Sequence, residues 1–284
     1  MKVIQIDMRK IIIVILLILM SDLGTAKVLG TEQNRRPAES ESTYVLIISG
    51  INKDPNERLA KDKAVVNLCE FFLNNANVES ERLSVLVDNS SSVRKDSKLS
   101  TAENLKKTIN ALATAIKPTD KFIFYYVGQA NVVTDKLRLN LPGKDITHEQ
   151  LAEWINEIKA SSILIVLDCP GAGLAAKAMT GEGRIVICSS TSDQHYSTQF
   201  SEYFVPALVD NKSDTDGDAK VSLLEAFTCA SRQLDDFYGE RHLLKTETPV
   251  LEDNGDGLPS EQPWRYKQDR KDGLAASRAF LSNE

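Results

Sequence analysis

Five short apolar runs, separated by helical patterns, constrain the fold more than any other feature of this sequence. The runs are rich in β-branched and aromatic residues, which is typical of strands buried on both faces of a parallel sheet. Strands that alternate with helices are joined by right-handed crossovers. The sequence therefore predicts an α/β fold, a three-layer sandwich with a mostly parallel sheet flanked by helices. The five runs are residues 44–49, 83–87, 122–127, 163–167 and 185–188.

Two stretches between these runs have the apolar spacing of helices that cover a sheet. In residues 105–116 and 151–158, apolar side chains recur every three or four positions, so each helix would present one apolar stripe. Thr101 and Thr147 precede these stretches and are predicted as N-caps. In such folds the working site lies beyond the carboxyl ends of the strands. The loops of interest are therefore residues 50–56, 128–131, 168–173 and 189–195.

The two ends of the chain differ from its middle in composition. An apolar run at residues 11–20 follows Arg9 and Lys10, and small and polar residues lead from it to Ala26. A membrane-spanning helix needs about twenty apolar residues, so residues 1–26 are predicted to be a signal peptide, with no stable membrane span after its removal. The protein is then secreted or periplasmic. Residues 27–42 are predicted to be a flexible spacer, and residues 258–284 a polar, loosely docked tail.

Charge and cysteine content exclude several classes of protein. The net charge of −6 arises from 34 basic and 40 acidic residues without a long block of one sign, so no nucleic-acid partner is expected. Four cysteines are too few for a disulfide framework in a chain of 284 residues. Cys69, Cys188 and Cys229 lie in apolar runs and are interpreted as small buried hydrophobes.

Two predicted strand ends carry a pair of motifs. The strand at 122–127 runs into Gly128-Gln129-Ala130, and the strand at 163–167 runs into Asp168-Cys169-Pro170-Gly171-Ala172-Gly173. In order, spacing and placement they resemble the caspase and legumain-like cysteine peptidases, whose strands end in Gly-His-Gly and Asp-x-Cys-x-x-Gly. The resemblance covers residues 43–257 and implies a caspase-like fold there. Within that group the chain most resembles secreted bacterial legumain-like proteins, because it also carries the acidic segments at 214–218 and 251–257.

This chain departs from the family at both catalytic positions. Gln129 occupies the position of the histidine, and an amide neither takes nor releases a proton near neutral pH. Pro170 occupies the position of the cysteine, and proline has neither a nucleophilic side chain nor a backbone N–H. The resemblance therefore implies a pseudopeptidase, a peptidase-fold protein that binds a peptide or protein without efficient hydrolysis.

Cys169, one residue before Pro170, has three interpretations. In the first it is a buried cysteine, as the burial statistics of this residue type favour. In the second it is the nucleophile of an active cysteine endopeptidase with His195 as base, and His195 is also the histidine best placed to serve Ser189 or Ser190. In the third it forms a disulfide with Cys188, which requires their Cα atoms to lie about 5–6 Å apart.

Residues 214–225 follow the spacing of a twelve-residue calcium loop. The sixth position holds Ala219 where the pattern has glycine, and a left-handed backbone there costs an alanine about 1–2 kcal/mol. The segment therefore predicts a structural calcium site of reduced affinity, and with it a calcium-stabilised binding module as a further function. The alternative is an acidic turn in front of a helix. The predicted ligands are Asp214, Asp216, Asp218, the backbone carbonyl of Lys220, and Glu225.

Overall fold

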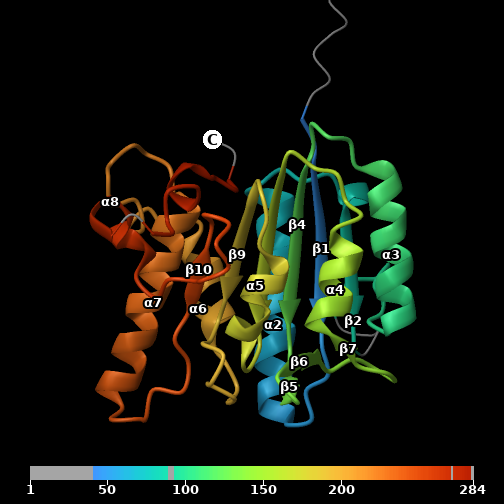
Figure 1. Ribbon diagram of the computed structural model, residues 1–284, viewed down its shortest axis with the longest axis horizontal. Coiled ribbons are helices and arrows are strands. Elements are labelled where there is room, and N and C mark those ends of the chain that lie inside the picture. The colour runs from blue at the N-terminus through green and yellow to red at the C-terminus, as the bar shows by residue number, and fades with distance from the viewer. Residues whose placement is uncertain (1–40, 89–92, 270, 283–284) are drawn as a thin grey trace, which may run out of the picture. The chain divides into compact units, whose positions relative to one another are not determined.

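The structure, a computed structural model, describes residues 41–88, 93–269 and 271–282. Within them one seven-stranded sheet has the order β10-β9-β8-β4-β1-β2-β3, and a smaller sheet has the order β5-β6-β7 (Figure 1). The strands are β1 (Thr43–Ser49), β2 (Leu83–Val87), β3 (Lys98–Leu99), β4 (Lys121–Val127), β5 (Ala130–Val133), β6 (Lys136–Leu139), β7 (Ile146–Thr147), β8 (Ser162–Asp168), β9 (Arg184–Cys188) and β10 (Val250–Glu252).

The five predicted strands are confirmed as the centre of the large sheet. β1, β2, β4, β8 and β9 pair with their neighbours in parallel, and only β10 runs antiparallel, against β9. Side chains alternate between the two faces, as in β1, where Val45 and Ile47 join one apolar cluster and Leu46 and Ile48 join the other. The sequence did not predict β10, because three residues are too few for a periodic signal.

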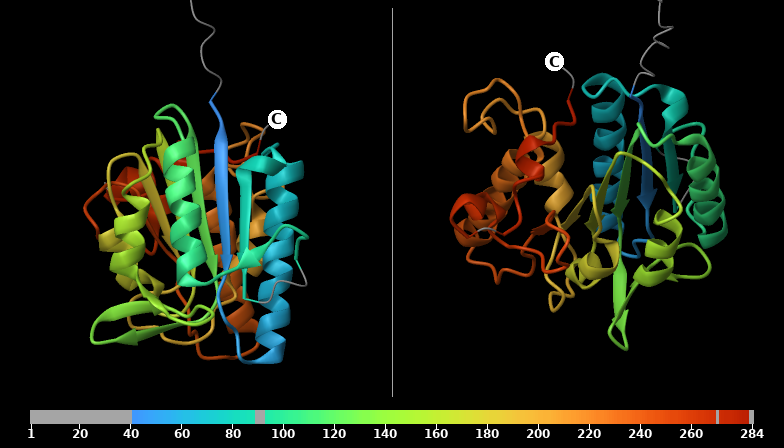
Figure 2. Two further views of the ribbon diagram at one scale, coloured as in Figure 1. Left: turned by 90° about the vertical axis from the view of Figure 1, so that its right-hand side faces the viewer. Right: turned by 45° about the horizontal axis from the view of Figure 1, so that its top comes forward.

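Helices cover both faces of the large sheet, so the domain has three layers (Figure 2). α2, α6 and α7 contribute to the apolar cluster on one face, and α3, α4 and α5 to the cluster on the other. The α-helices are α2 (Pro55–Asn74), α3 (Ala102–Ala115), α4 (His148–Ile155), α5 (Ala176–Met179), α6 (Phe200–Ala207), α7 (Leu223–Glu240) and α8 (Tyr266–Asp269). Short 3₁₀ turns are η1 (Ser80–Arg82), η2 (Ala172–Ala175), η3 (Pro263–Arg265) and η4 (Ala276–Arg278).

Side chains cap the helices where the sequence predicts them. The Thr101 hydroxyl accepts from an N–H in the first turn of α3, and Thr147 forms a reciprocal capping box with Gln150 at α4. Helix α2 was not predicted, although Asp54 caps it and Pro55 occupies its first position. This helix matters for the site, because it follows β1 in the chain and begins near the end of that strand (Figure 1).

The segment after Gly257 packs on the domain, whereas its polar composition predicts a loosely docked tail. Asp272 and Ala276 are fully buried, and both Asp253 carboxylate oxygens accept N–H groups from the tail, from Gly273 and from Ala276. The docking combines these polar contacts with apolar ones, because Ala276, Trp264 and Leu281 join or pack against an apolar cluster. The described part of this tail comprises residues 258–269 and 271–282.

Several expectations about the chain's start concern residues outside the described part. The predicted signal peptide, residues 1–26, and residues 27–40 of the predicted spacer lie there. Within residues 41–88, 93–269 and 271–282, no helix combines the length and the apolar character needed to cross a bilayer.

Candidate functional site

The candidate site lies at the edge of the sheet where β1, β4 and β8 end, together with the small β5–β7 sheet (Figure 1). The Gly128 N–H donates to the Asp168 carbonyl (3.1 Å), which ties the loop after β4 to the end of β8. The loop after β1 is equally close, because a Cβ added to Gly128 would lie 2.7 Å from the Gly50 Cα. Only glycine permits this approach of two backbones. Three of the four predicted loops, those after β1, β4 and β8, therefore meet at one edge.

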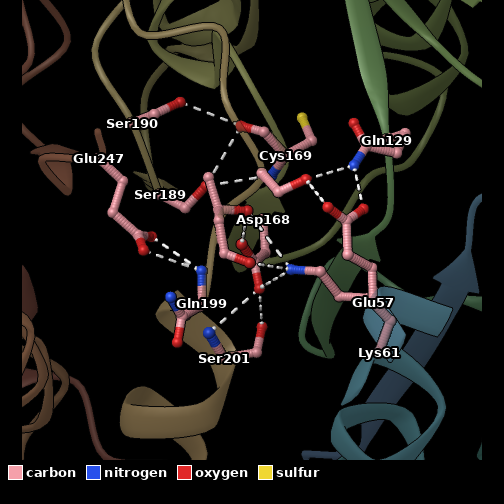
Figure 3. Close-up of polar contacts among 12 residues, drawn as sticks. Glu57, Lys61, Gln129, Asp168, Cys169, Ser189, Ser190, Gln199, Ser201 and Glu247 are labelled. Carbon is pink, nitrogen blue, oxygen red and sulfur yellow. Dashed lines mark hydrogen bonds and ion pairs between the residues drawn. The ribbon is translucent and has the colours of Figure 1, made fainter. Parts of the chain in front are cut away.

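Gln129 holds two other segments together at this edge. Its side chain is half-buried, and its Nε2 donates to Glu57 Oε2 (2.7 Å) and to Ser197 Oγ (2.6 Å). Ser197 Oγ donates in turn to Glu57 Oε1 (2.6 Å), which closes a triangle of hydrogen bonds. Figure 3 shows Glu57 and Gln129 facing each other. The amide can orient these groups but cannot transfer a proton between them.

Cys169 and Pro170 are both buried at the end of β8. The Cys169 side chain is 0% exposed and belongs to the apolar cluster beneath α3, α4 and α5, which confirms its interpretation as a buried cysteine. Burial raises the pKa of the Cys169 thiol well above its usual range, and the charge of Asp168 raises it further. A nucleophilic cysteine needs an accessible thiolate. The alternative in which Cys169 attacks a substrate does not meet that requirement.

His195, the proposed base, and Ser189 and Ser190, the other groups it was expected to serve, are engaged elsewhere. His195 is exposed, and its Nε2 lies 2.9 Å from the Ser192 carbonyl oxygen. Ser189 and Ser190 are fully buried, and each hydroxyl donates to the Cys169 carbonyl, at 3.2 and 3.0 Å. These hydroxyls therefore brace the loop after β8 and are shielded from a substrate.

The remaining cysteine assignments are partly confirmed. Cys169 and Cys188 are both free, so the proposed disulfide does not form. Cys69 and Cys188 are buried as predicted. Cys229 is only half-buried, because its position on α7 lies at the border of the apolar stripe.

A buried ion pair lies directly under the Gln129 network. Lys61 Nζ is 3.4 Å from Asp168 Oδ2, and it donates to the Thr198 carbonyl at 2.5 Å. Asp168 also accepts from the Thr198 hydroxyl (2.5 Å) and from the Ser201 N–H (3.1 Å) and hydroxyl. Burial alone would raise the pKa of Asp168, but Lys61 and these hydrogen bonds outweigh it and hold the pKa below its usual value. Asp168 is therefore ionised at neutral pH.

Glu247 is a second fully buried carboxylate beside this pair. Its two oxygens accept the Gln199 N–H, at 2.9 and 3.0 Å (Figure 3). One of them also accepts the Tyr238 hydroxyl at 3.1 Å. Burial, followed by the charge of Asp168, raises the pKa of Glu247 to about 8. Two carboxyl groups thus share one ammonium, and the second carboxyl is protonated at neutral pH.

Sequence reasoning missed the residues of this network outside the family motifs. Lys61 falls on the apolar stripe of α2 with Ala64, Val65 and Leu68, and a lysine on such a stripe is a signal that a buried partner exists. Glu57 lies one turn earlier on the same helix. Glu247 lies in a short polar connection without periodicity, and no local pattern identifies it.

The acidic loop after α6 brings three of its predicted ligands together. Carboxylate oxygens of Asp214, Asp216 and Asp218 lie within 4.8 Å of one another, so this cluster could hold a metal ion. Ala219 adopts a φ of +69°, the left-handed conformation expected at the sixth position of the loop. The strain predicted for this alanine is therefore present.

Glu225, the predicted twelfth-position ligand, does not join these three carboxylates. One of its oxygens accepts the Thr215 N–H at 2.7 Å, and the other accepts the Ser222 N–H at 2.9 Å. Ser222 in turn caps α7 in a capping box with Glu225. The same carboxylate also accepts the Asp216 N–H at 3.2 Å, so it lies against the acidic loop while it serves the helix start, and its role as a metal ligand stays a prediction.

A cavity of about 760 Å³ lies away from the candidate site, at the opposite edge of the sheet. Residues from the beginnings of β1, β4 and β8 line it, together with residues 275 and 278–282 of the tail. It is therefore distinct from the hydrogen-bond network around Gln129.

The fold and this edge define an α/β protein with a mostly parallel sheet and a polar network at its strand ends. No protein-family model matches the chain, and a search of curated proteins finds no match either.

Proposed function

We propose that this chain is an exported protein with a caspase- and legumain-like fold, a pseudopeptidase that binds a peptide or protein without cleaving it. One observation carries the proposal. Where the cysteine peptidases that this chain resembles have a histidine, it has Gln129, whose amide donates hydrogen bonds to Glu57 and Ser197. The buried thiol of Cys169 supports the same conclusion.

Exposed apolar side chains at the same edge support a peptide or protein ligand. Leu59, Tyr196 and Leu244 are 71%, 64% and 81% exposed. Leu59 lies in the first turns of α2, Tyr196 in the loop after β9, and Leu244 just after α7, which ends at this edge (Figure 1). Exposed aromatic and aliphatic side chains are the groups that most often anchor a bound polypeptide.

The first prediction is that the purified chain does not cleave peptides. A mixed library of internally quenched peptides should give the same signal with the native chain and with Cys169→Ser, because a buried, protonated thiol is a poor nucleophile. A thiol-reactive probe should label Cys229, which is half-buried, far faster than Cys169.

Cys229→Ser is the matched control for this experiment, because it removes a thiol that lies outside the candidate site. Cleavage that survives Cys229→Ser but is lost in Cys169→Ser would overturn the pseudopeptidase proposal. A peptide array tests whether the chain binds peptides. Peptides that the native chain captures should no longer be captured by Tyr196→Ala or by Leu244→Asp. If both variants still capture them, this edge is not the binding surface.

A structural calcium ion at Asp214, Asp216 and Asp218 is the second part of the proposal. Their gathered carboxylates repel one another unless a cation offsets their charge, and calcium prefers oxygen ligands. We expect calcium to stabilise the fold by about 2.7 kcal/mol at 100 times its dissociation constant. For a domain of this size that is a rise in melting temperature of about 5–10 °C, measured with and without chelator.

Two variants separate calcium binding from a general salt effect. Asp216→Asn should abolish the rise in melting temperature, whereas Asp210→Asn, at a half-buried acid four residues before the cluster, should leave it unchanged. Ala219→Gly should increase the rise, because glycine relieves the left-handed strain. An equal rise in native protein and Asp216→Asn would remove calcium from the proposal.

A further inference from the structure

A five-residue strap, residues 197–201, runs across the candidate site and into α6. It is tied at successive positions to three carboxylates that come from different parts of the chain. Two of these carboxylates, Asp168 and Glu247, are fully buried. The contacts are Ser197 to Glu57, Thr198 and Ser201 to Asp168, and Gln199 to Glu247. Most polar contacts of the strap therefore depend on the positions of these carboxylates.

We propose that proton release from Glu247 loosens the strap, so that the candidate site is held closed in mildly acidic solution and opens as the pH rises. The inference deepens the proposed function and rests on it, because the strap carries Ser197, a member of the Gln129 network. It concerns the regulation of that site by pH.

The charges around Glu247 explain why its proton matters. Asp168 faces it from β8, Lys61 from α2, Tyr238 from α7 and Tyr203 from α6. With Glu247 protonated, Asp168 and Lys61 balance each other. With Glu247 ionised, a single ammonium faces two carboxylates away from water, and one negative charge is left uncompensated.

The direction of the pH effect follows from the two states of Glu247. Its pKa is about 8 with the strap in place, against 4.5 for an ordinary glutamate in water. In the open state Glu247 is exposed to water and has its ordinary pKa. The equilibrium constant for strap opening therefore rises about tenfold per pH unit between pH 4.5 and about pH 8. Above about pH 8 Glu247 is ionised whether the strap is closed or open, so the equilibrium constant for opening no longer changes with pH.

Hydrogen exchange of the strap amides tests the proposal in the full chain. Protection factors, corrected for the intrinsic pH dependence of exchange, are measured from about pH 5 to about pH 9 for a peptide that covers the strap. In the native chain we expect protection to fall by at least about tenfold between pH 5 and pH 8 and then to level off. In Glu247→Gln, whose amide oxygen still accepts the Gln199 N–H, protection should stay constant within about twofold.

Three further variants make the result specific. His195→Gln controls for a histidine that lies two residues before the strap, and Glu252→Gln for another fully buried carboxyl, on β10; both should keep the native profile. Tyr238→Phe removes a hydrogen-bond donor that favours ionised Glu247. In this variant the pH at which strap protection stops falling should therefore be higher than in the native chain.

Two results would overturn the strap proposal: a flat profile in the native chain, or an equal fall in Glu247→Gln. The measurement uses no peptide and no catalytic assay. Failure of peptide binding therefore remains distinguishable from failure of the strap.

Discussion

Replacing Lys61 with methionine is expected to lower the free energy of unfolding by about 3–5 kcal/mol at neutral pH. Methionine has a similar volume, so the loss arises from charge rather than packing. Asp168 is 0% exposed, and without the ammonium it must either stay charged in a buried place or take up a proton. Urea unfolding followed by circular dichroism measures the effect.

The pH dependence of this loss has a defined sign. Without Lys61, the pKa of Asp168 rises from its lowered position, because burial, the largest influence on it, is then opposed only by the hydrogen bonds from Thr198 and Ser201. The stability that a lowered carboxyl pKa contributes is present above the pKa of the unfolded chain and is lost as the pH falls through the folded value. The deficit of Lys61→Met should therefore shrink toward acid pH.

Lys63→Met is the matched control, because Lys63 is an exposed lysine on the same helix. It should change stability by no more than about 0.5 kcal/mol. The double variant Lys61→Met, Asp168→Asn should recover part of the loss, because it removes the orphaned charge. Equal effects of the two single lysine variants would show that the buried ion pair does not hold this edge of the sheet.

Replacing Phe200 with alanine is the second large effect, a loss of about 3–5 kcal/mol. Phe200 lies within the strap, at the first position of α6, and is 0% exposed. Its ring stacks on Phe204 at 4.9 Å and lies 6.1 Å from Phe227 of α7, so its removal leaves a cavity between two helices and the sheet. Thermal and urea unfolding both report the loss.

Tyr203→Ala provides the comparison for Phe200→Ala on the same helix. Tyr203 is half-buried and packs at the border of the core against Phe237, so its truncation leaves a more open space that solvent can fill. We expect a clearly smaller loss than for Phe200→Ala. A loss at Phe200 of less than about 1 kcal/mol would contradict its assignment as an anchor of α6.

The candidate site was predictable only in part. Gln129 and Asp168 stand at the ends of strands that local patterns identify, and parallel strands bring their ends to one edge. The partners that give these residues their properties come from far along the chain. Lys61 is 107 residues from Asp168, and Glu57 is 72 residues from Gln129. No short pattern records such a pairing.

The acidic loop shows the same limit at short range. Spacing alone places Asp214, Asp216, Asp218 and Glu225 in one ligand set, and the structure gathers only the three aspartates. Glu225 also lies in the first turn of α7, and its hydrogen bonds with Thr215 and Ser222 compete with any role in a metal site. The calcium-loop pattern and the helix capping box both include Glu225, and the sequence alone does not show which of them its carboxylate follows.

The sequence by itself determined the alternation of strands and helices, the three-layer architecture, and the absence of imidazole and thiol side chains at positions 129 and 170. These follow from residue type and local periodicity, which do not depend on distant contacts. Only the tertiary structure decided that Cys169 is shielded, that Lys61 pairs with Asp168, and that Glu247 holds a proton at neutral pH. Burial and the distance between charges determine these properties, and both exist only after the chain has folded.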